Sequence, residues 1–123
     1  MTFQSGRCNC GSITVQLHRN VVTTIACHCL NCRRAGGAFS INYVVEDDNV
    51  AVNDPQSTIS LYRDDDTESG NSVQRAFCQN CGCPIFTKTP ALEGRTILKA
   101  SLFADVVAQR GSDLFSNRKI IWE

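Results

Sequence analysis

The sequence lacks a net charge, because its 12 Lys and Arg residues balance its 12 Asp and Glu residues. Phosphate binding usually requires a basic excess, so we expect no nucleic-acid partner. No apolar run approaches the roughly 20 residues of a membrane span, so we expect no membrane partner either. The first residues do not combine a basic stretch with an apolar one, as a secretory signal does. These absences predict a cytoplasmic protein.

Long amphipathic helical patterns are also missing, and short strand patterns take their place. With 123 residues the chain is long enough for one domain and too short for two, so we expect residues 1–123 to share one core. Apolar residues alternate with their neighbours over 13–17 and 39–45, which predicts half-buried strands. Less regular patterns predict strands at 21–26, 58–62, 73–77, 84–87, 96–102 and 119–122. The expected fold class is therefore all-β.

Helical structure is expected only in short turns. Glycines that end a helix predict one turn at 32–35 and another at 104–109. The acidic segment 64–72 contains no apolar residue, so we interpret it as a solvated loop. His18 is expected at the exposed end of a strand. The aromatic residues expected to fill the core are Phe77, Phe86, Phe103 and Trp122.

Cysteine, by contrast, is abundant, with eight residues in three tight groups. The groups are Cys8-x-Cys10, Cys27-x-Cys29-x-x-Cys32 and Cys78-x-x-Cys81-x-Cys83. Disulfide scaffolds usually spread their cysteines to join distant loops, whereas closely spaced thiols let one turn offer several ligands to one ion. A cytoplasmic location would also keep the thiols reduced. The spacing therefore favours metal binding over disulfides.

Zinc is the metal that such thiol groups favour. A structural zinc site has four protein ligands, whereas a catalytic site has three and an open position for water or substrate. The segment 78–82, CQNCG, has the form of a zinc knuckle, in which glycine permits the tight backbone that brings amides close to the sulfurs. A knuckle needs a second pair of ligands, which either the Cys8 group or the Cys27 group could provide. The spacing alone leaves both pairings open.

Four segments resemble the successive motifs of one known family. They are GRCNCG at 6–11, CHCLNCR at 27–33, AGGA at 35–38 and RAFCQNCGCP at 75–84. With these motifs the sequence resembles the glutathione-dependent formaldehyde-activating enzyme family, which also includes centromere protein V. The resemblance runs from about Gly6 to Trp122. It implies a single zinc-binding domain with a β-tent fold, in which compact antiparallel sheets hold zinc sites between them.

The resemblance also implies an activity and a division of the cysteines between two zinc ions. The structural ion would be held by Cys8, Cys10, Cys78 and Cys81, and the catalytic ion by Cys27, Cys29 and Cys32. The implied activity is that of a zinc-dependent carbon–sulfur lyase. Glutathione, as co-substrate, adds through its thiolate to formaldehyde or a related aldehyde and gives S-hydroxymethylglutathione, and the reverse reaction cleaves the carbon–sulfur bond. The expected partner is thus a small-molecule thiol or thiol adduct.

Several residues near the cysteines allow more than one interpretation. Arg33 and Arg34 could bind the carboxylates of glutathione or merely solvate a helical turn. Cys83 could be a small buried apolar side chain or a fourth thiolate for the second zinc ion, which would close its open position. His28 is expected to have a structural or supporting role because its backbone would direct the ring away from the ion.

Two functions from different classes follow from these features. The first is the lyase just described, with a reactive zinc ion on Cys27, Cys29 and Cys32. The second is a non-catalytic, zinc-stabilised module that binds another protein, and a third, weaker hypothesis is redox sensing by exposed thiols. Ligand exchange at the second metal distinguishes the first two, because only a catalytic site changes its coordination when glutathione is added.

Overall fold

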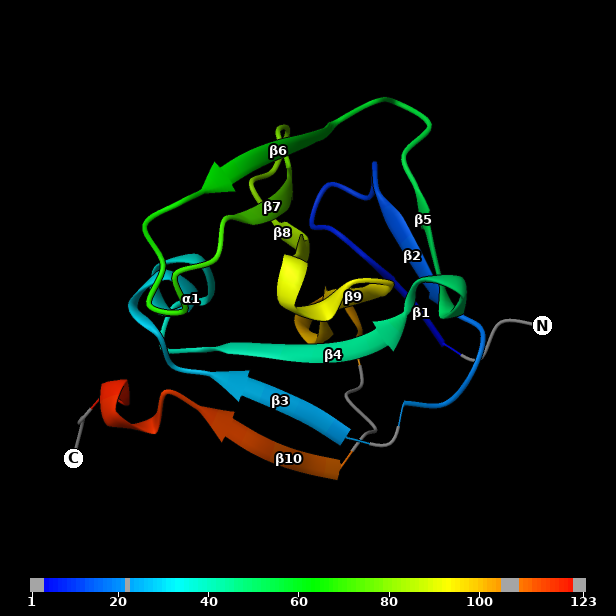
Figure 1. Ribbon diagram of the computed structural model, residues 1–123. Coiled ribbons are helices and arrows are strands. Elements are labelled where there is room, and N and C mark those ends of the chain that lie inside the picture. Colours follow the sequence, from blue (N-terminus) through cyan, green and yellow to red (C-terminus); the bar gives the residue numbers. More distant parts are fainter. Residues whose placement is uncertain (1–3, 22, 105–108, 121–123) are drawn as a thin grey trace.

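Two β-sheets and a short α-helix form the protein in the computed structural model, which describes residues 4–21, 23–104 and 109–120 (Figure 1). The smaller sheet has the order β1 (Gln4–Arg7), β2 (Thr14–Leu17) and β5 (Val50–Asn53). The larger sheet has the order β10 (Gln109–Leu114), β3 (Thr23–Cys27), β4 (Ser40–Glu46), β9 (Arg95–Lys99), β8 (Pro84–Lys88), β7 (Val73–Cys78) and β6 (Ile59–Asp64). The all-β fold class is therefore confirmed.

Most of the strand pairs are antiparallel, as the family resemblance implies. Strand β10 instead runs parallel to β3, with Leu114 opposite Cys27 and a register shift between Arg110 and Asp113. The backbone N–H of His28 extends this pairing by donating to the carbonyl of Leu114 at 2.9 Å. A late strand thus holds the end of β3 in place.

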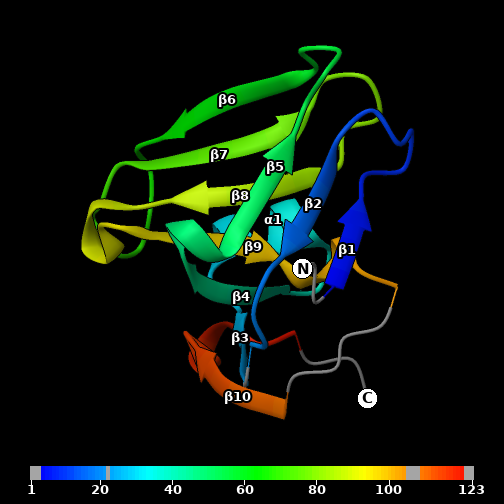
Figure 2. The same ribbon diagram turned by 90° about the vertical axis from the view of Figure 1, so that its right-hand side faces the viewer.

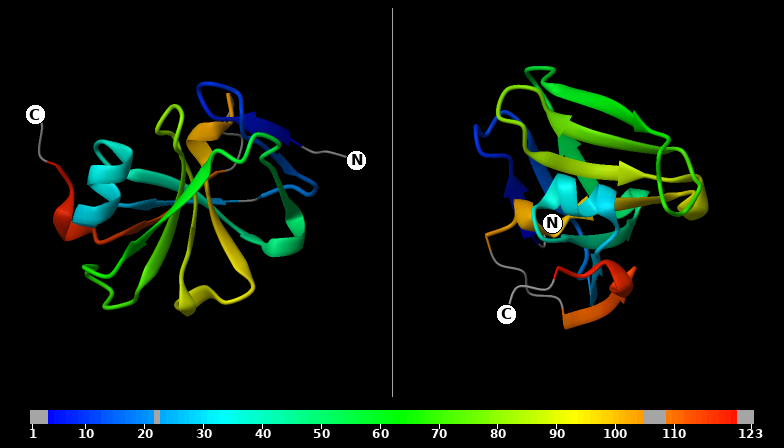
Figure 3. Two further views of the ribbon diagram at one scale, coloured as in Figure 1. Left: turned by 90° about the horizontal axis from the view of Figure 1, so that it is seen from above. Right: turned by 90° about the vertical axis from the view of Figure 1, so that its left-hand side faces the viewer.

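The central strands of the larger sheet separate two layers (Figures 2 and 3). The smaller sheet lies on one side of strands β7, β8 and β9, and helix α1 (Leu30–Gly36) lies on the other. Tyr43 and Val45 in β4 therefore point into the core, whereas Asn42 and Val44 line a cavity on the helix side. The largest fully buried side chains are Tyr43, Ile13, Leu17, Ile85, Leu98, Val15, Cys8 and Cys78.

Gly6 allows the smaller sheet to approach the 3₁₀ turn η3 (Ala100–Leu102). A Cβ atom at position 6 would lie 2.7 Å from the carbonyl oxygen of Leu102 and 3.0 Å from a ring carbon of Phe103. Such short contacts are not tolerated, so the position requires a residue without a side chain. The close approach fixes the segment that leads to Cys8.

Six expected strands have both ends within two residues of the ends of an observed strand, namely β2, β3, β4, β6, β7 and β8. Strand β9 ends at Lys99, three residues before the expected limit, because the chain turns into η3. The turn expected at 32–35 belongs to α1. Residues 119 and 120 form no strand, so that prediction is wrong for them. Residues 121–122, with Trp122, and residues 105–108 of the second expected turn lie outside the described residues.

Three strands were not predicted, and the prediction that Phe77 lies in the core is wrong. Strands β1, β5 and β10 were missed because none of them alternates apolar with polar residues. Phe103 is buried in the core and Phe86 packs against it, as expected. Phe77 is half-buried and lines a surface hollow instead. No helix in the described ranges has the length and hydrophobicity that crossing a membrane requires.

Asp54 is expected to make stability depend on pH at the start of β6. Its carboxylate accepts hydrogen bonds from the amides of Ile59 (3.0 Å) and Thr58 (2.8 Å), which hold the pKa of Asp54 below its usual value. A lowered folded-state pKa adds stability above the unfolded pKa of about 3.9, and this stability is lost as the pH falls through the folded pKa. Asp54→Asn should therefore be less stable than the wild type near neutral pH, and the difference should shrink in acid.

Urea denaturation at several pH values measures this difference. Asp48→Asn is the matched control, because Asp48 is exposed and forms only a surface ion pair with Arg19. A stability difference for Asp54→Asn that stays constant down to about pH 3 would contradict the assignment.

Candidate metal centres

The structure brings four cysteines together between the two sheets. The sulfurs of this four-cysteine cluster, Cys8, Cys10, Cys78 and Cys81, all lie within 4.8 Å of one another. Cys10 Sγ is 3.6 Å from Cys8 Sγ and 3.7 Å from Cys78 Sγ. Two thiolates on one tetrahedral zinc ion lie about 3.8 Å apart, given a Zn–S distance of about 2.3 Å, whereas a disulfide is about 2.05 Å long. The donor set thus fits zinc, and the Cys8 group is the one that meets the knuckle.

Ser12 supports the four-cysteine cluster from one side. Its hydroxyl lies 3.1 Å from Cys10 Sγ, 3.5 Å from Cys78 Sγ and 2.8 Å from the hydroxyl of Thr58. The hydrogen bond with Ser12 lowers the pKa of Cys10 to about 5, whereas burial raises the pKa of Cys8. An ionised thiol at Cys10 is the form that binds a metal.

The knuckle has the backbone geometry that the sequence predicts. Gly82 adopts φ +81°, which favours glycine, and its N–H donates to the carbonyl of Cys78 at 2.7 Å. Burial opposes ionisation of Cys78, but hydrogen bonds from Ser12 and from the amides of Cys81 and Asn80 lower its pKa to about 7. The turn therefore directs amides at a sulfur atom, as zinc knuckles do.

Cys83 lies outside both cysteine clusters. Its Sγ accepts a hydrogen bond from the backbone N–H of Asn9 at 3.3 Å, on the side of the four-cysteine cluster. The side chain is half-buried and packs against the core. This placement fits the interpretation of Cys83 as a small packed side chain and separates it from the Cys27 group.

The second group, the three-cysteine cluster, consists of Cys27, Cys29 and Cys32. Each residue is only 8% exposed, and the three sulfurs lie within 4.8 Å of one another. Cys27 ends β3, whereas Cys29 caps α1 by accepting a hydrogen bond from the amide of Cys32 at 3.4 Å. The Sγ atoms of Cys27 and Cys29 are 3.5 Å apart. This donor set also fits a zinc ion, with three protein ligands.

Two cations lie beside the three-cysteine cluster, and neither was predicted. Lys99 is 5% exposed, and its Nζ donates to Ser40 Oγ at 2.7 Å and to Asn42 Oδ1 at 3.1 Å. No carboxylate among the described residues forms an ion pair with Lys99. Arg75 is the second cation and interacts electrostatically with the thiol of Cys32. Lys99 and Arg75 therefore place an excess of positive charge next to the three thiols.

The neighbouring thiols, with a smaller contribution from the two cations, make Cys32 the thiol of the cluster that ionises most readily. The hydrogen bond from Cys27, together with that from Cys29 and the charges of Lys99 and Arg75, lowers the pKa of Cys32 to about 5 against the effect of burial. The bond to Cys32 and burial raise the pKa of Cys27, and burial raises that of Cys29. Burial also lowers the pKa of Lys99. The cluster therefore holds at least one thiolate near neutral pH.

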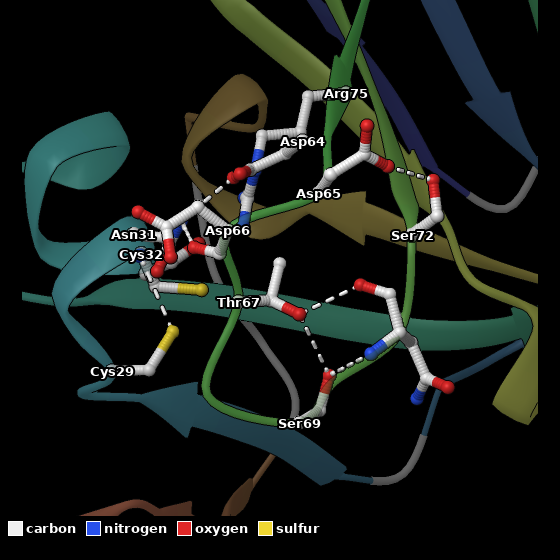
Figure 4. A network of polar contacts seen from close by, with 12 residues as sticks. Cys29, Asn31, Cys32, Asp64, Asp65, Asp66, Thr67, Ser69, Ser72 and Arg75 are labelled. Carbon is white, nitrogen blue, oxygen red and sulfur yellow. Dashed lines mark hydrogen bonds and ion pairs between the residues drawn. The ribbon is translucent and has the colours of Figure 1, made fainter.

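The segment 64–72 is part of this site, so its interpretation as a merely solvated loop is wrong (Figure 4). Asp64 ends β6, is buried, and accepts hydrogen bonds from Arg75 Nε at 2.8 Å and from Asn31 Nδ2 at 2.9 Å. Asn31 also donates to the carbonyl of Asp66 at 2.7 Å. The acidic segment is thus held against α1, because Asp64 neutralises the half-buried Arg75.

Asp64→Asn is expected to lower the free energy of unfolding by about 3 kcal/mol, because it leaves the Arg75 guanidinium without its counter-charge in a largely buried position. Asp65→Asn, one residue later, is the control. Asp65 pairs with Arg63 at the surface, where both side chains are more than half exposed, so its loss should destabilise the protein far less than the loss of Asp64. Denaturant titration measures both values, and equal losses would refute the role given to Asp64.

A cavity of about 220 Å³ opens beside the three-cysteine cluster and is lined by all three of its residues. Lys99, Arg75 and Thr87 line it as well. The same three residues also line a second hollow, between α1 and strands β7 and β8. The two spaces thus adjoin at these three residues, and of the two only the cavity is lined by the thiols.

Arg33 and Arg34, which the sequence suggests as ligands for the carboxylates of glutathione, have different surroundings in the structure. Arg34 is exposed, lines the second hollow, and forms no ion pair within the described part of the chain. Arg33 lines neither space, and its guanidinium donates to the carbonyl of Arg118 at 3.4 Å. Of the two arginines, Arg34 alone lines one of these two spaces.

The two histidines have the placements expected from the sequence. His28 is buried outside the cysteine cluster, with Nε2 3.0 Å from Asp113 Oδ1 and its ring 5.2 Å from that of Phe39. It therefore ties the Cys27–Cys29 segment to β10. His18 is exposed and directly follows β2.

Comparisons with known proteins agree with this architecture. No curated protein matches the chain. A crystal structure of a Rhodobacter sphaeroides protein is similar in fold, with a TM-score of 0.65 and 17% sequence identity over 87% of this chain and 99% of that one. The family model for the glutathione-dependent formaldehyde-activating enzyme matches residues 3–122. With nearly its whole length matched, the chain belongs to the glutathione-dependent formaldehyde-activating enzyme family.

Proposed function

We propose that this protein is a zinc-dependent carbon–sulfur lyase that forms and cleaves the adduct of glutathione with formaldehyde or a related aldehyde. The observation that supports this most is the three-cysteine cluster, whose buried thiols line a cavity next to two cations. The family suggests glutathione-dependent formaldehyde activation. The free thiols of both clusters also suit a reducing compartment such as the cytoplasm.

In the proposed reaction the sulfur of the thiol forms a bond with the carbonyl carbon. The π electron pair of the carbonyl moves to its oxygen, and the thiol proton ends on that oxygen, so the product is a hydroxyalkyl thioether. A zinc ion on Cys27, Cys29 and Cys32 would supply an acceptor for the incoming sulfur, because three thiolates leave one of four positions to a substrate.

The chain's own residues would favour the anionic sulfur. Lys99 and Arg75 place positive charge beside the cluster in a water-poor environment, where charges interact more strongly than in bulk water. Arg34 is exposed in the adjoining hollow and is proposed to bind a glutathione carboxylate. Arg33 is not assigned this role, because it lies away from both spaces.

Cys29→Ser tests the reactive centre with little change to the fold. Serine is a good N-cap residue, so α1 should persist, but a hydroxyl is a poor zinc ligand at neutral pH. We expect bound zinc to fall from two ions to one per chain and adduct formation, followed by NMR, to fall at least about 100-fold. Cys83→Ser, a matched change outside both clusters, should retain both zinc ions and the activity.

Titration with glutathione separates the lyase from the alternative, a zinc-stabilised protein-binding module. The zinc-loaded protein is followed by X-ray absorption and calorimetry. A lyase should show heat and a new sulfur ligand at one of its two ions. If both zinc ions keep their coordination and no heat of binding is measured, the result supports the protein-binding module and contradicts the proposed lyase activity.

A further inference from the structure

The cavity beside the three-cysteine cluster is larger than formaldehyde requires. Its volume is about 220 Å³. A water molecule occupies about 30 Å³ of liquid, and an apolar protein cavity of about 150 Å³ binds benzene. The space therefore suits a group of several carbon atoms better than the single carbon of formaldehyde.

The walls of the cavity are hydrocarbon. Ile25, Val44, Val73 and Ile97 come from four strands of the larger sheet, and Leu114 and Phe115 close the side next to the cysteines. These side chains share one face because alternate residues of each strand point away from the core. Such a surface gains free energy by covering an apolar ligand and offers no partner to a carboxylate.

The charged residues that line the cavity already have partners. Arg75 is paired with Asp64 at 2.8 Å, Glu68 with Arg118 at 2.9 Å, and Lys99 is bonded to Ser40 and Asn42. Lys99 has only neutral partners and lies next to the thiols, so the other described residues that line the cavity offer no unpaired cation to a glutathione carboxylate. The hydrocarbon part of an adduct is the part that fits there.

Thr87 adds a polar group to the cavity wall that a ligand oxygen could hydrogen-bond. It is 6% exposed and lines the cavity, and its Oγ1 is buried without a hydrogen-bond partner among the described residues. A buried hydroxyl without a partner costs about 1–3 kcal/mol, so a ligand oxygen placed there would be favoured. The hydroxyl group of a thiol–aldehyde adduct has such an oxygen, on the carbon that also carries the aldehyde's substituent.

We propose that the adduct handled by this protein carries a hydrocarbon substituent of about three to six carbons, contributed by the aldehyde, which occupies the apolar cavity while Thr87 hydrogen-bonds the adduct's oxygen. This inference rests on the proposed lyase function and names its substrate class. Formaldehyde, which has no substituent, leaves the apolar walls uncovered.

Binding of unreactive thioethers tests the inference without turnover. Calorimetry of the zinc-loaded protein compares S-methylglutathione with S-butylglutathione, which differ by three methylene groups. Each buried methylene should improve the Kd about fourfold, so the butyl compound should bind roughly 50-fold more tightly. A ratio near one, or no binding of either compound at millimolar concentration, would overturn the inference.

Two substitutions at Val44 locate the effect. Val44→Phe fills the cavity and should bring the butyl-over-methyl ratio close to one, whereas Val44→Ala enlarges it and should move the preference to longer chains. Thr87→Val should lower kcat/KM for the butanal adduct about tenfold, since it removes the hydroxyl and keeps the shape. A ratio of about 50 that neither Val44 variant changes would place the alkyl group elsewhere and refute the proposal.

Kinetics separate this inference from the proposed function. With glutathione, butanal should give a higher kcat/KM than formaldehyde. Turnover of the formaldehyde adduct alone would refute the inference and keep the lyase, and no turnover of any adduct would refute the lyase. The last comparison is between butanethiol with formaldehyde and glutathione with butanal. If the first pair reacts faster, the thiol and not the aldehyde contributes the hydrocarbon group, and the inference is overturned.

Discussion

Cys78→Ser is expected to leave the protein largely unfolded under conditions in which the wild type is folded. Cys78 is fully buried and belongs to the four-cysteine cluster that joins the smaller sheet to the turn between β7 and β8. Binding of a structural zinc ion contributes on the order of 10 kcal/mol to the folding of small zinc domains. This is comparable to the whole stability of a domain, about 5–15 kcal/mol, so the loss of one ligand should remove most of it.

Circular dichroism and metal analysis measure this effect. The variant should lose its β-sheet signal and its zinc, and a strong chelator should do the same to the wild type. Cys83→Ser is the control, because it makes the same substitution five residues later at a position outside both clusters. A folded Cys78→Ser protein with two zinc ions would show that this cluster does not hold the fold together.

Lys99→Met should give the second large effect, this time on activity. The ammonium group of Lys99 is buried next to the three thiols, so methionine removes its charge and keeps most of its volume. Electrostatic groups in such surroundings contribute about 100-fold to 1000-fold to rates. We expect kcat/KM for adduct cleavage to fall at least about 100-fold, while the fold remains, because methionine has no charge to desolvate.

The pH dependence of metal binding provides a second readout for Lys99. Its charge helps to keep the pKa of Cys32 near 5, so its removal should raise that pKa. Since the thiolate binds the metal, zinc binding by the variant should require a higher pH than in the wild type. Lys88→Met is the control, because Lys88 is a partly exposed cation paired with Asp47. An unchanged rate and pH profile for Lys99→Met would remove Lys99 from the proposed site.

The sequence predicts the strands with clear alternation and misses elements that depend on tertiary contacts. The segments around Val15 and Tyr43 alternate because one face is buried, and both form strands. Strand β10, with the sequence QRGSDL, has no such pattern and forms because its backbone pairs with β3. Its position next to Cys27 could not be predicted from local composition.

For the site, the sequence identifies the thiols and not the charges around them. The spacing of Cys27, Cys29 and Cys32 predicts their grouping, because a single turn joins them. Arg75 and Lys99 come from distant strands and meet the cysteines only in the folded sheet. A lysine between the apolar residues Leu98 and Ala100 is the one sequence signal of a buried cation, since such a position normally excludes charge.

The parallel pairing of β10 with β3 has a consequence for how the two centres are assembled in a cell. Synthesis proceeds from the N-terminus, and early segments begin to fold first. All four sulfurs of the Cys8–Cys81 cluster exist once residue 81 has been made, whereas the strand that flanks Cys27 ends at Leu114. The four-cysteine cluster can thus be complete in sequence before the strand that flanks the three-cysteine cluster has been synthesised, and that flank is added last.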